Sequence, residues 1–134
     1  MFDEGSGYLA LKAVMMPRDT NPYGTIFGGV LLSYIDQAGA VGARWEILQR
    51  FQEEPVLVTV AMDKVEFHEP VFVGDTVSFV TRISRVGNSS VTVQVSVTTE
   101  RNQQEVRLTE AQVTYVRVAM DGSVRKPMSI RSDS

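Results

Sequence analysis

The stretch GVLLSYIDQAGAVGARWEIL, residues 29–48, decides the fold. It is long enough for five helical turns, contains no proline and is followed by a charged segment that ends at Pro55. We therefore predict one long α-helix here. Apolar or small residues stand nearly all round this helix, a pattern typical of a helix enclosed by a larger element. Its small residues predict the close approach of another backbone.

The segments after Pro55 predict β-strands. Residues 90–98 alternate valines with polar residues, which is the period-two pattern of a half-buried strand. Further strands are predicted at 56–67, 75–86 and about 106–118, after a weaker first strand at 8–16, with short connectors that favour antiparallel hairpins. We therefore expect an α+β fold of order β-α-β-β-β-β, in which a five-stranded antiparallel sheet wraps around one long central helix.

A single sheet cannot cover such a helix on every side. The remaining helix face and the sheet edge need a cover, and the simplest cover is a second copy of the chain. We therefore expect a symmetric homodimer.

Composition narrows the class of protein further. The 134 residues, 43% hydrophobic and 22% charged, predict a single globular domain with a core at about 8–120 and a basic tail at 121–134. A net charge of −3 gives no general attraction to nucleic acid. The absence of cysteine excludes disulfides and thiolate sites, and a single histidine excludes a His-rich metal cluster. No signal peptide or membrane span is indicated, so we expect a cytoplasmic protein without a membrane partner.

Asp36 is the most unusual residue of the predicted helix. It is the only charge in the twenty-four residues 20–43, where the average for the chain predicts about five. Burying a carboxylate is costly unless it is hydrogen-bonded or retained for function. Two interpretations stay open: Asp36 faces solvent beside Gln37, or it carries chemistry.

The segment GTIFGG, residues 24–29, leads into the helix. Unpaired amides at a helix start favour a carbonyl oxygen that acquires negative charge, although the glycines also fit a turn that needs positive φ. Asp36 lies seven residues after Gly29, about 10 Å along the helix axis. If both act on one carbonyl, the site combines the helix start of one copy with Asp36 of another.

Other candidate groups carry weaker signals. His68 has no serine in a nucleophile-elbow pattern to act with, so we do not predict a catalytic triad. The turn at 87–90 offers amides and hydroxyls to a phosphate, but the same residues also form ordinary hairpins. Cations such as Arg82 and Arg85 are typical of scattered surface charges.

Several motifs together resemble one family. They are DTNPYGTIFGG at 19–29, SYIDQAG at 33–39, VTV at 58–60 and FHEPVFVGD at 67–75. This pattern is similar to the hotdog-fold acyl-CoA thioesterases, in particular the bacterial broad-specificity branch related to cytosolic acyl-CoA hydrolases, over about residues 9–127. The resemblance implies hotdog homodimers, often hexamers built as trimers of dimers, that hydrolyse acyl-CoA to fatty acid and coenzyme A without a metal or organic cofactor.

The resemblance also implies roles for particular residues. Asp36 matches the catalytic carboxylate, and Asn21 matches an asparagine that assists from the other subunit, while Thr25 holds a second aligned polar position. The amides of Gly28 and Gly29 would polarise the thioester carbonyl. The implied substrate and coenzyme A contacts are Thr59, Gly87, Asn88, Ser89, Ser90, Arg125 and Lys126. Asp36 would act either as a general base on water or as a nucleophile that forms an anhydride.

Three other functions compete with hydrolysis. A non-catalytic acyl-CoA sensor or carrier module would bind the thioester without releasing thiol. A hotdog dehydratase needs a histidine paired with a carboxylate, and the only histidine, His68, lies outside the helix. A structural assembly protein would have no affinity for thioesters. The preferred acyl chain, the choice between coenzyme A and acyl carrier protein, and the choice between dimer and hexamer stay open.

Overall fold

The computed structural model describes residues 7–120 and 125–127. The elements, in chain order, are β1 (Tyr8–Val14), the 3₁₀ turn η1 (Pro17–Asp19), α1 (Gly28–Phe51), β2 (Val56–Phe67), β3 (Thr76–Val86), β4 (Ser90–Arg101) and β5 (Gln104–Val118). This order confirms the predicted β-α-β-β-β-β arrangement. Most of the predicted tail, 121–134, lies outside the described residues.

Several element ends differ from the predicted ones by one or two residues; β1, for example, ends at Val14 and not at residue 16. Two ends differ by three residues. The helix continues past residue 48 to Phe51, where Gln52 takes a left-handed conformation and ends it. Strand β4 continues to Arg101, because its hairpin to β5 is closed by Asn102 and Gln103 alone, both with positive φ. In both places polar residues that indicated a loop belong to the regular element.

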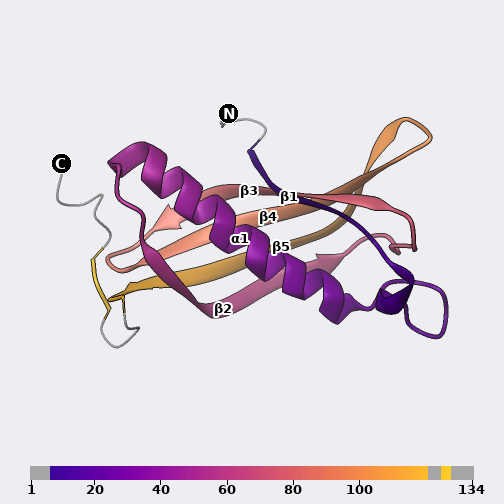
Figure 1. Ribbon diagram of the computed structural model, residues 1–134, viewed down its shortest axis with the longest axis horizontal. Helices are drawn as coiled ribbons and strands as arrows, with labels where there is room; N and C mark the ends of the chain where they lie inside the picture. The colour runs from indigo at the N-terminus through magenta and orange to yellow at the C-terminus, as the bar shows by residue number, and fades with distance from the viewer. Residues whose placement is uncertain (1–6, 121–124, 128–134) are drawn as a thin grey trace.

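The five strands form one antiparallel sheet in the order β1-β3-β4-β5-β2. The helix α1 lies across one face of this sheet, as Figure 1 shows. Strand β2 follows the helix in sequence but pairs with β5 at the edge, so β2 and β3 are not neighbours. The edges are therefore β1 and β2.

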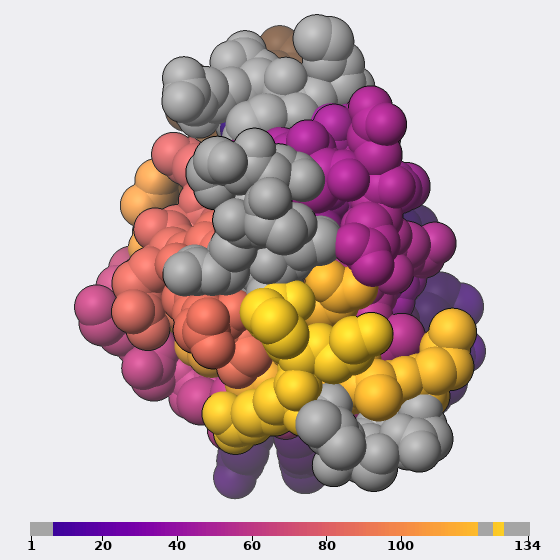
Figure 2. Space-filling model, turned by 90° about the vertical axis from the view of Figure 1, so that its left-hand side faces the viewer, coloured from indigo at the N-terminus to yellow at the C-terminus, as the bar shows by residue number. Residues whose placement is uncertain are grey.

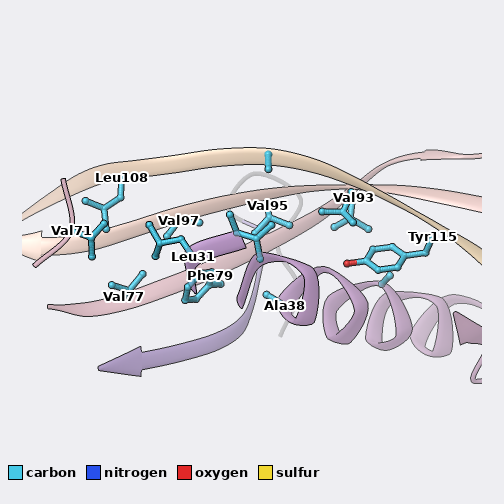
Figure 3. Packing of buried hydrophobic residues seen from close by; sticks show 14 of the residues in the cluster. Leu31, Ala38, Val71, Val77, Phe79, Val93, Val95, Val97, Leu108 and Tyr115 are labelled. Carbon is cyan, nitrogen blue, oxygen red and sulfur yellow. The ribbon is translucent and has the colours of Figure 1, made fainter. Parts of the chain in front are cut away.

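The core lies between the helix and the three inner strands, β3, β4 and β5. Val91, Val93, Val95 and Val97 of β4 are fully buried, which confirms the alternation read from the sequence. Val93, Val95 and Val97 lie on the side of β4 that faces α1, as Figure 3 shows, and Val91 belongs to the same core cluster. Removing this apolar surface from water is the main stabilising contribution to the fold.

Two helix glycines allow this close packing. A Cβ at Gly39 would clash with the hydroxyl of Tyr115, and one at Gly42 would clash with the side chain of Thr81. The partners are therefore side chains of the sheet. The prediction that another backbone approaches the small residues of the helix was therefore wrong for Gly39 and Gly42, which are approached by side chains.

Strand β2 is the least covered element of the sheet. None of its twelve described residues is buried, and Val58, Val60 and Phe67 are 41%, 48% and 52% exposed. An exposed edge strand with apolar side chains favours pairing with another chain, which supports the expectation of a second copy. Among the described residues, no helix is long and apolar enough to cross a membrane.

Candidate active site

Asp36 lies in the third turn of α1, half-buried, on the side that faces β2. Its Oδ1 accepts a hydrogen bond of 2.7 Å from the Thr59 hydroxyl of β2. Its backbone carbonyl accepts a second one, of 2.6 Å, from the hydroxyl of Tyr115 on β5. The neighbouring Gln37 is exposed, and its side chain donates to the Ser33 hydroxyl of the same helix. Asp36 is thus fixed by the sheet rather than loose on the surface beside Gln37.

Tyr115 supports the helix turn that carries Asp36. Burial raises the pKa of its phenol above the usual range, and the negative charge of Asp36 raises the pKa further, against a smaller opposite effect of the Ala40 amide. Tyr115 therefore stays protonated and remains a hydrogen-bond donor. The sequence analysis missed this residue; the available signal was a tyrosine among the inward-facing positions of β5.

The start of α1 presents unpaired amides. The cap residue, Phe27, accepts hydrogen bonds from the amides of Val30 and Leu31 at 3.1 and 3.4 Å. Among the described residues, the amides of Gly28 and Gly29 donate to no recorded acceptor. Positive φ occurs at Gly24 and not at either of these two. A turn that needs positive φ therefore explains Gly24 but not Gly28 and Gly29. These two glycines offer two amide donors to a ligand.

A hollow of about 390 Å³ opens beside this helix start. Its apolar lining includes Ile26, Leu31, Phe67 and Val71. The ring of Phe67 lies against Gly28, 3.4 Å from the place where a Cβ would stand. Thr25, His68 and Glu69 also line this hollow, so the amide end of the helix borders a space whose lining is apolar only in part.

Asn21 organises the loop before the helix. Its side-chain oxygen accepts the amides of Tyr23 and Thr25 at 2.9 and 3.1 Å, and its side-chain nitrogen donates to the Thr25 hydroxyl at 2.7 Å. The two aligned polar positions are thus bonded to each other within one chain. The role of Asn21 toward a substrate in another subunit stays a prediction.

The predicted coenzyme A contacts lie at the opposite end of the helix. The turn at 87–90 is closed by a 2.8 Å bond from the Gly87 amide to the Ser90 carbonyl. Arg117 of β5 donates its amide to the Ser89 carbonyl and accepts the amide of Lys126, both at 2.8 Å. Figure 2 shows the yellow end of the described chain beside the salmon-coloured β3–β4 hairpin. The structure therefore brings the turn and the tail residues 125–127 together.

Arg117, which the sequence analysis missed, is the link between them. It is only 7% exposed, and its guanidinium donates to the Pro127 carbonyl at 3.2 Å and to Glu53 at 2.6 Å. No local pattern identifies it, because an arginine in a strand ordinarily faces solvent.

The predicted residues thus form three groups in one chain. The helix-start group is Asn21, Gly28 and Gly29; the central group is Asp36 and Thr59; the tail-end group is Gly87, Asn88, Ser89, Ser90, Arg125 and Lys126. The chain does not join these three groups into one site. Gly29 and Asp36 stay about 10 Å apart along the helix axis.

A further cluster joins Glu66, His68 and Glu110, whose donor atoms lie within 4.8 Å of one another. The His68 Nε2 is 3.7 Å from one oxygen of each glutamate. Arg107 pairs with the same Glu110 oxygen, so an arginine already holds one of the three ligand atoms that a metal would need. The sequence analysis missed this cluster, since it depends on the register of Glu66 opposite Glu110.

Comparisons with known proteins identify relatives of this chain. The family model described as the thioesterase superfamily matches residues 23–106. The acyl-CoA thioester hydrolase YciA of Salmonella typhimurium is 36% identical, over 89% of this chain and 89% of that protein. An uncharacterized acyl-CoA thioester hydrolase of Zymomonas mobilis is 39% identical over 67% of this chain, which spans only 56% of that longer relative.

A solved structure extends the likeness to three dimensions. The hexameric hotdog fold thioesterase of Campylobacter jejuni superposes with a TM-score of 0.79 at 46% identity, covering 91% of this chain and 90% of that one. The expected hotdog fold is confirmed by this match together with the sheet order and the single helix. The chain belongs to the thioesterase superfamily.

Proposed function

We propose that this protein is an acyl-CoA thioester hydrolase in which Asp36 is the catalytic carboxylate. The observation that carries the proposal is the fixed position of Asp36, held through Thr59 against an exposed edge strand. The hydrolase names of the relatives support the same activity. In this proposal the whole chain forms one domain and works in the cytoplasm.

The second half of the site comes from another copy of the chain. Thr59, which holds Asp36, lies near the start of β2, and Phe67, which contacts Gly28, is its last residue. Antiparallel pairing of two β2 edges places the start of one strand beside the end of the other. The carboxylate of one copy would therefore meet the helix-start amides of the other. We propose this dimer as the catalytic unit, assembled into a hexamer like its Campylobacter jejuni relative.

The reaction needs three things from these residues. Asp36 takes a proton from water as the water oxygen attacks the thioester carbon, or it attacks that carbon itself to give an anhydride that water then cleaves. The amides of Gly28 and Gly29 in the other copy stabilise the oxyanion. In either route the carbon–sulfur bond breaks when the oxyanion collapses, and coenzyme A leaves as a thiolate; in the second route this step forms the anhydride, before water cleaves it. We propose that no cofactor takes part, because a thioester is already activated and its thiolate is a good leaving group.

The remaining groups would bind the two ends of the substrate. The partly apolar hollow beside Gly28 fits an acyl chain whose carbonyl lies on the helix-start amides. The exposed cations Arg125 and Lys126, next to the turn at 87–90, fit the phosphates of coenzyme A.

The test is thiol release from acyl-CoAs that range from acetyl to palmitoyl, with one aromatic acyl group. We expect hydrolysis that depends on chain length, and we expect Asp36→Asn to lower kcat about a thousandfold or more. Glu105→Gln, which changes an exposed carboxylate of β5, is the matched control and should retain activity. Binding of acyl-CoA without thiol release would instead support the sensor function.

A further inference from the structure

We propose that Arg101 is a positioning residue for the reaction. It lies at the end of β4, outside all three groups of predicted site residues, and acts on the helix-start amides through the connection between β2 and β3. This inference rests on the proposed function, because it assigns those amides to the oxyanion.

The guanidinium of Arg101 makes three contacts with that connection. Its Nη2 donates to the Pro70 carbonyl at 2.9 Å and to the Asp75 carboxylate at 2.6 Å. Its central carbon lies 5.2 Å from the centre of the Phe72 ring. The side chains of Arg101 and Asp75 are 26% and 15% exposed, so the ion pair is mostly shielded from water. Arg101 thus holds both ends of the segment 70–75.

The held segment in turn supports the residues that precede α1. The Asp75 carboxylate also accepts the Phe72 amide at 2.9 Å, which fixes the backbone at Phe72. Phe72 forms a bridge with Thr25, and the Val71 carbonyl accepts the Ile26 amide at 2.8 Å. These contacts end directly before the helix cap, Phe27. The position of the first two helix amides is therefore set by a path that begins at Arg101.

Backbone bonds hold the other side of the same segment. The Met15 amide donates to the Asp75 carbonyl, and the Gly74 amide donates to the Met15 carbonyl, each at 2.9 Å. Loss of Arg101 would leave these bonds in place. We therefore expect the segment to shift rather than unfold, with its largest displacement toward Pro70, Val71 and Phe72.

A small shift there should change the chemical step more than substrate binding. Oxyanion donors act only over a narrow range of distance, so displacing them lowers transition-state stabilisation. The proposed coenzyme A contacts lie at the other end of the helix and would keep their geometry. The kinetic signature is a lower kcat with little change in KM.

The test compares Arg101→Ala with a matched arginine variant. We expect Arg101→Ala to lower kcat about thirtyfold, while KM for the best acyl-CoA of the panel changes less than twofold. Arg107→Ala removes an arginine of β5 that pairs with Glu110 of the same strand, and it should leave kcat unchanged. Arg101→Lys should recover part of the rate, and free guanidinium at low millimolar concentration should partly rescue Arg101→Ala. A purely structural defect would not respond to guanidinium.

A second measurement keeps the inference testable without turnover. Hydrogen exchange at residues 25–31 should be faster in Arg101→Ala than in the wild type, while exchange at 87–90 should not change. Unchanged kcat together with unchanged hydrogen exchange in Arg101→Ala would overturn the role of Arg101. A fall in kcat accompanied by an equally large rise in KM, without rescue by guanidinium, would overturn it as well. If Arg101→Ala does not fold, Asp75→Asn weakens the same ion pair more gently and must show the same pattern. A wild-type protein that hydrolyses no acyl-CoA would overturn the proposed function instead.

Discussion

An arginine organises each end of the sheet, and the two ends differ in how their ion pairs are placed. Arg101 and Asp75 are 26% and 15% exposed and fix a segment that supports two unpaired amides. Arg117 is buried, but the side chain of its partner Glu53 is 52% exposed, and the tail that Arg117 holds carries exposed cations. The Arg101 ion pair thus fixes the position of the segment 70–75. The Arg117 ion pair holds a tail whose cations remain exposed to solvent.

The topology explains why the two arginines lie at opposite ends. Arg101 is the last residue of β4, and Arg117 is the last but one of β5. Because β4 and β5 are antiparallel neighbours, their carboxyl ends point in opposite directions. The comparison predicts that changes at the helix-start end act on kcat, and that changes at the tail end act on KM.

Among changes at the two ends of the sheet, the largest effect should come from removing one helix-start donor. Gly28→Pro deletes an amide hydrogen at the first helical position, where proline is well tolerated. The preceding residue, Phe27, has φ −57° and ψ 137°, a conformation that proline favours in its neighbour. We expect kcat to fall about a hundredfold, the usual cost of one oxyanion donor. Steady-state kinetics with the best acyl-CoA measures it.

Gly28→Ala is the control for this change. It adds the same Cβ near the Phe67 ring, 3.4 Å away, but keeps the amide hydrogen. We expect Gly28→Ala to stay within a few-fold of the wild type, and both variants to keep its melting temperature. Equal rates in the two variants would show that the Gly28 amide takes no part in the reaction.

Local patterns were enough to predict the elements but not their order in the sheet. The alternation in β4 and the prolines that flank β2 define those strands, and the bounds of β2 match the prediction, 56–67. The position of β2 at the edge beside β5 depends on pairing between distant segments, which no local pattern encodes. The β4–β5 hairpin was predicted from its short connector, but its two-residue turn was not, because Asn102 and Gln103 take positive φ without a glycine.

Some residues of the candidate site could be predicted from the sequence, and others could not. Asp36 was identified because an isolated charge in an apolar helix is visible in the sequence alone. Its pairing with Thr59 places together two residues that the family resemblance had indicated. Tyr115, Arg101 and Arg117 were missed, because each acts through contacts that only the folded chain creates.

A smaller effect is expected at the tail end. The double variant Arg125→Ala, Lys126→Ala removes two exposed cations beside the turn at 87–90. We expect KM for acyl-CoA to rise about tenfold at low salt with kcat unchanged, since each exposed charge pair contributes modestly. The corresponding acyl-pantetheine lacks the nucleotide, so its KM should not change. A rise in KM for both substrates would place these cations away from the nucleotide.

The smallest effect should come from the hydrophobic core between the two ends of the sheet, where Tyr115 lies. Tyr115→Phe removes the hydroxyl that donates to the Asp36 carbonyl at 2.6 Å. We expect the free energy of unfolding at pH 8 to fall by about 1 kcal/mol, the typical net value of one hydrogen bond. Urea unfolding of both proteins measures this difference. A loss of several kcal/mol would indicate that the helix turn itself collapses.

The same variant should change how stability depends on pH. Burial raises the pKa of Tyr115 in the folded chain, whereas an unfolded tyrosine titrates at about 10. Above that pH the unfolded chain releases a proton that the folded chain keeps, so this tyrosine's contribution is complete below pH 10 and falls by about 1.4 kcal/mol for each further unit. The gap between wild type and Tyr115→Phe should therefore narrow and then reverse between pH 9 and pH 11. A constant gap over that range would mean that Tyr115 titrates normally and that the Asp36 turn is open to water.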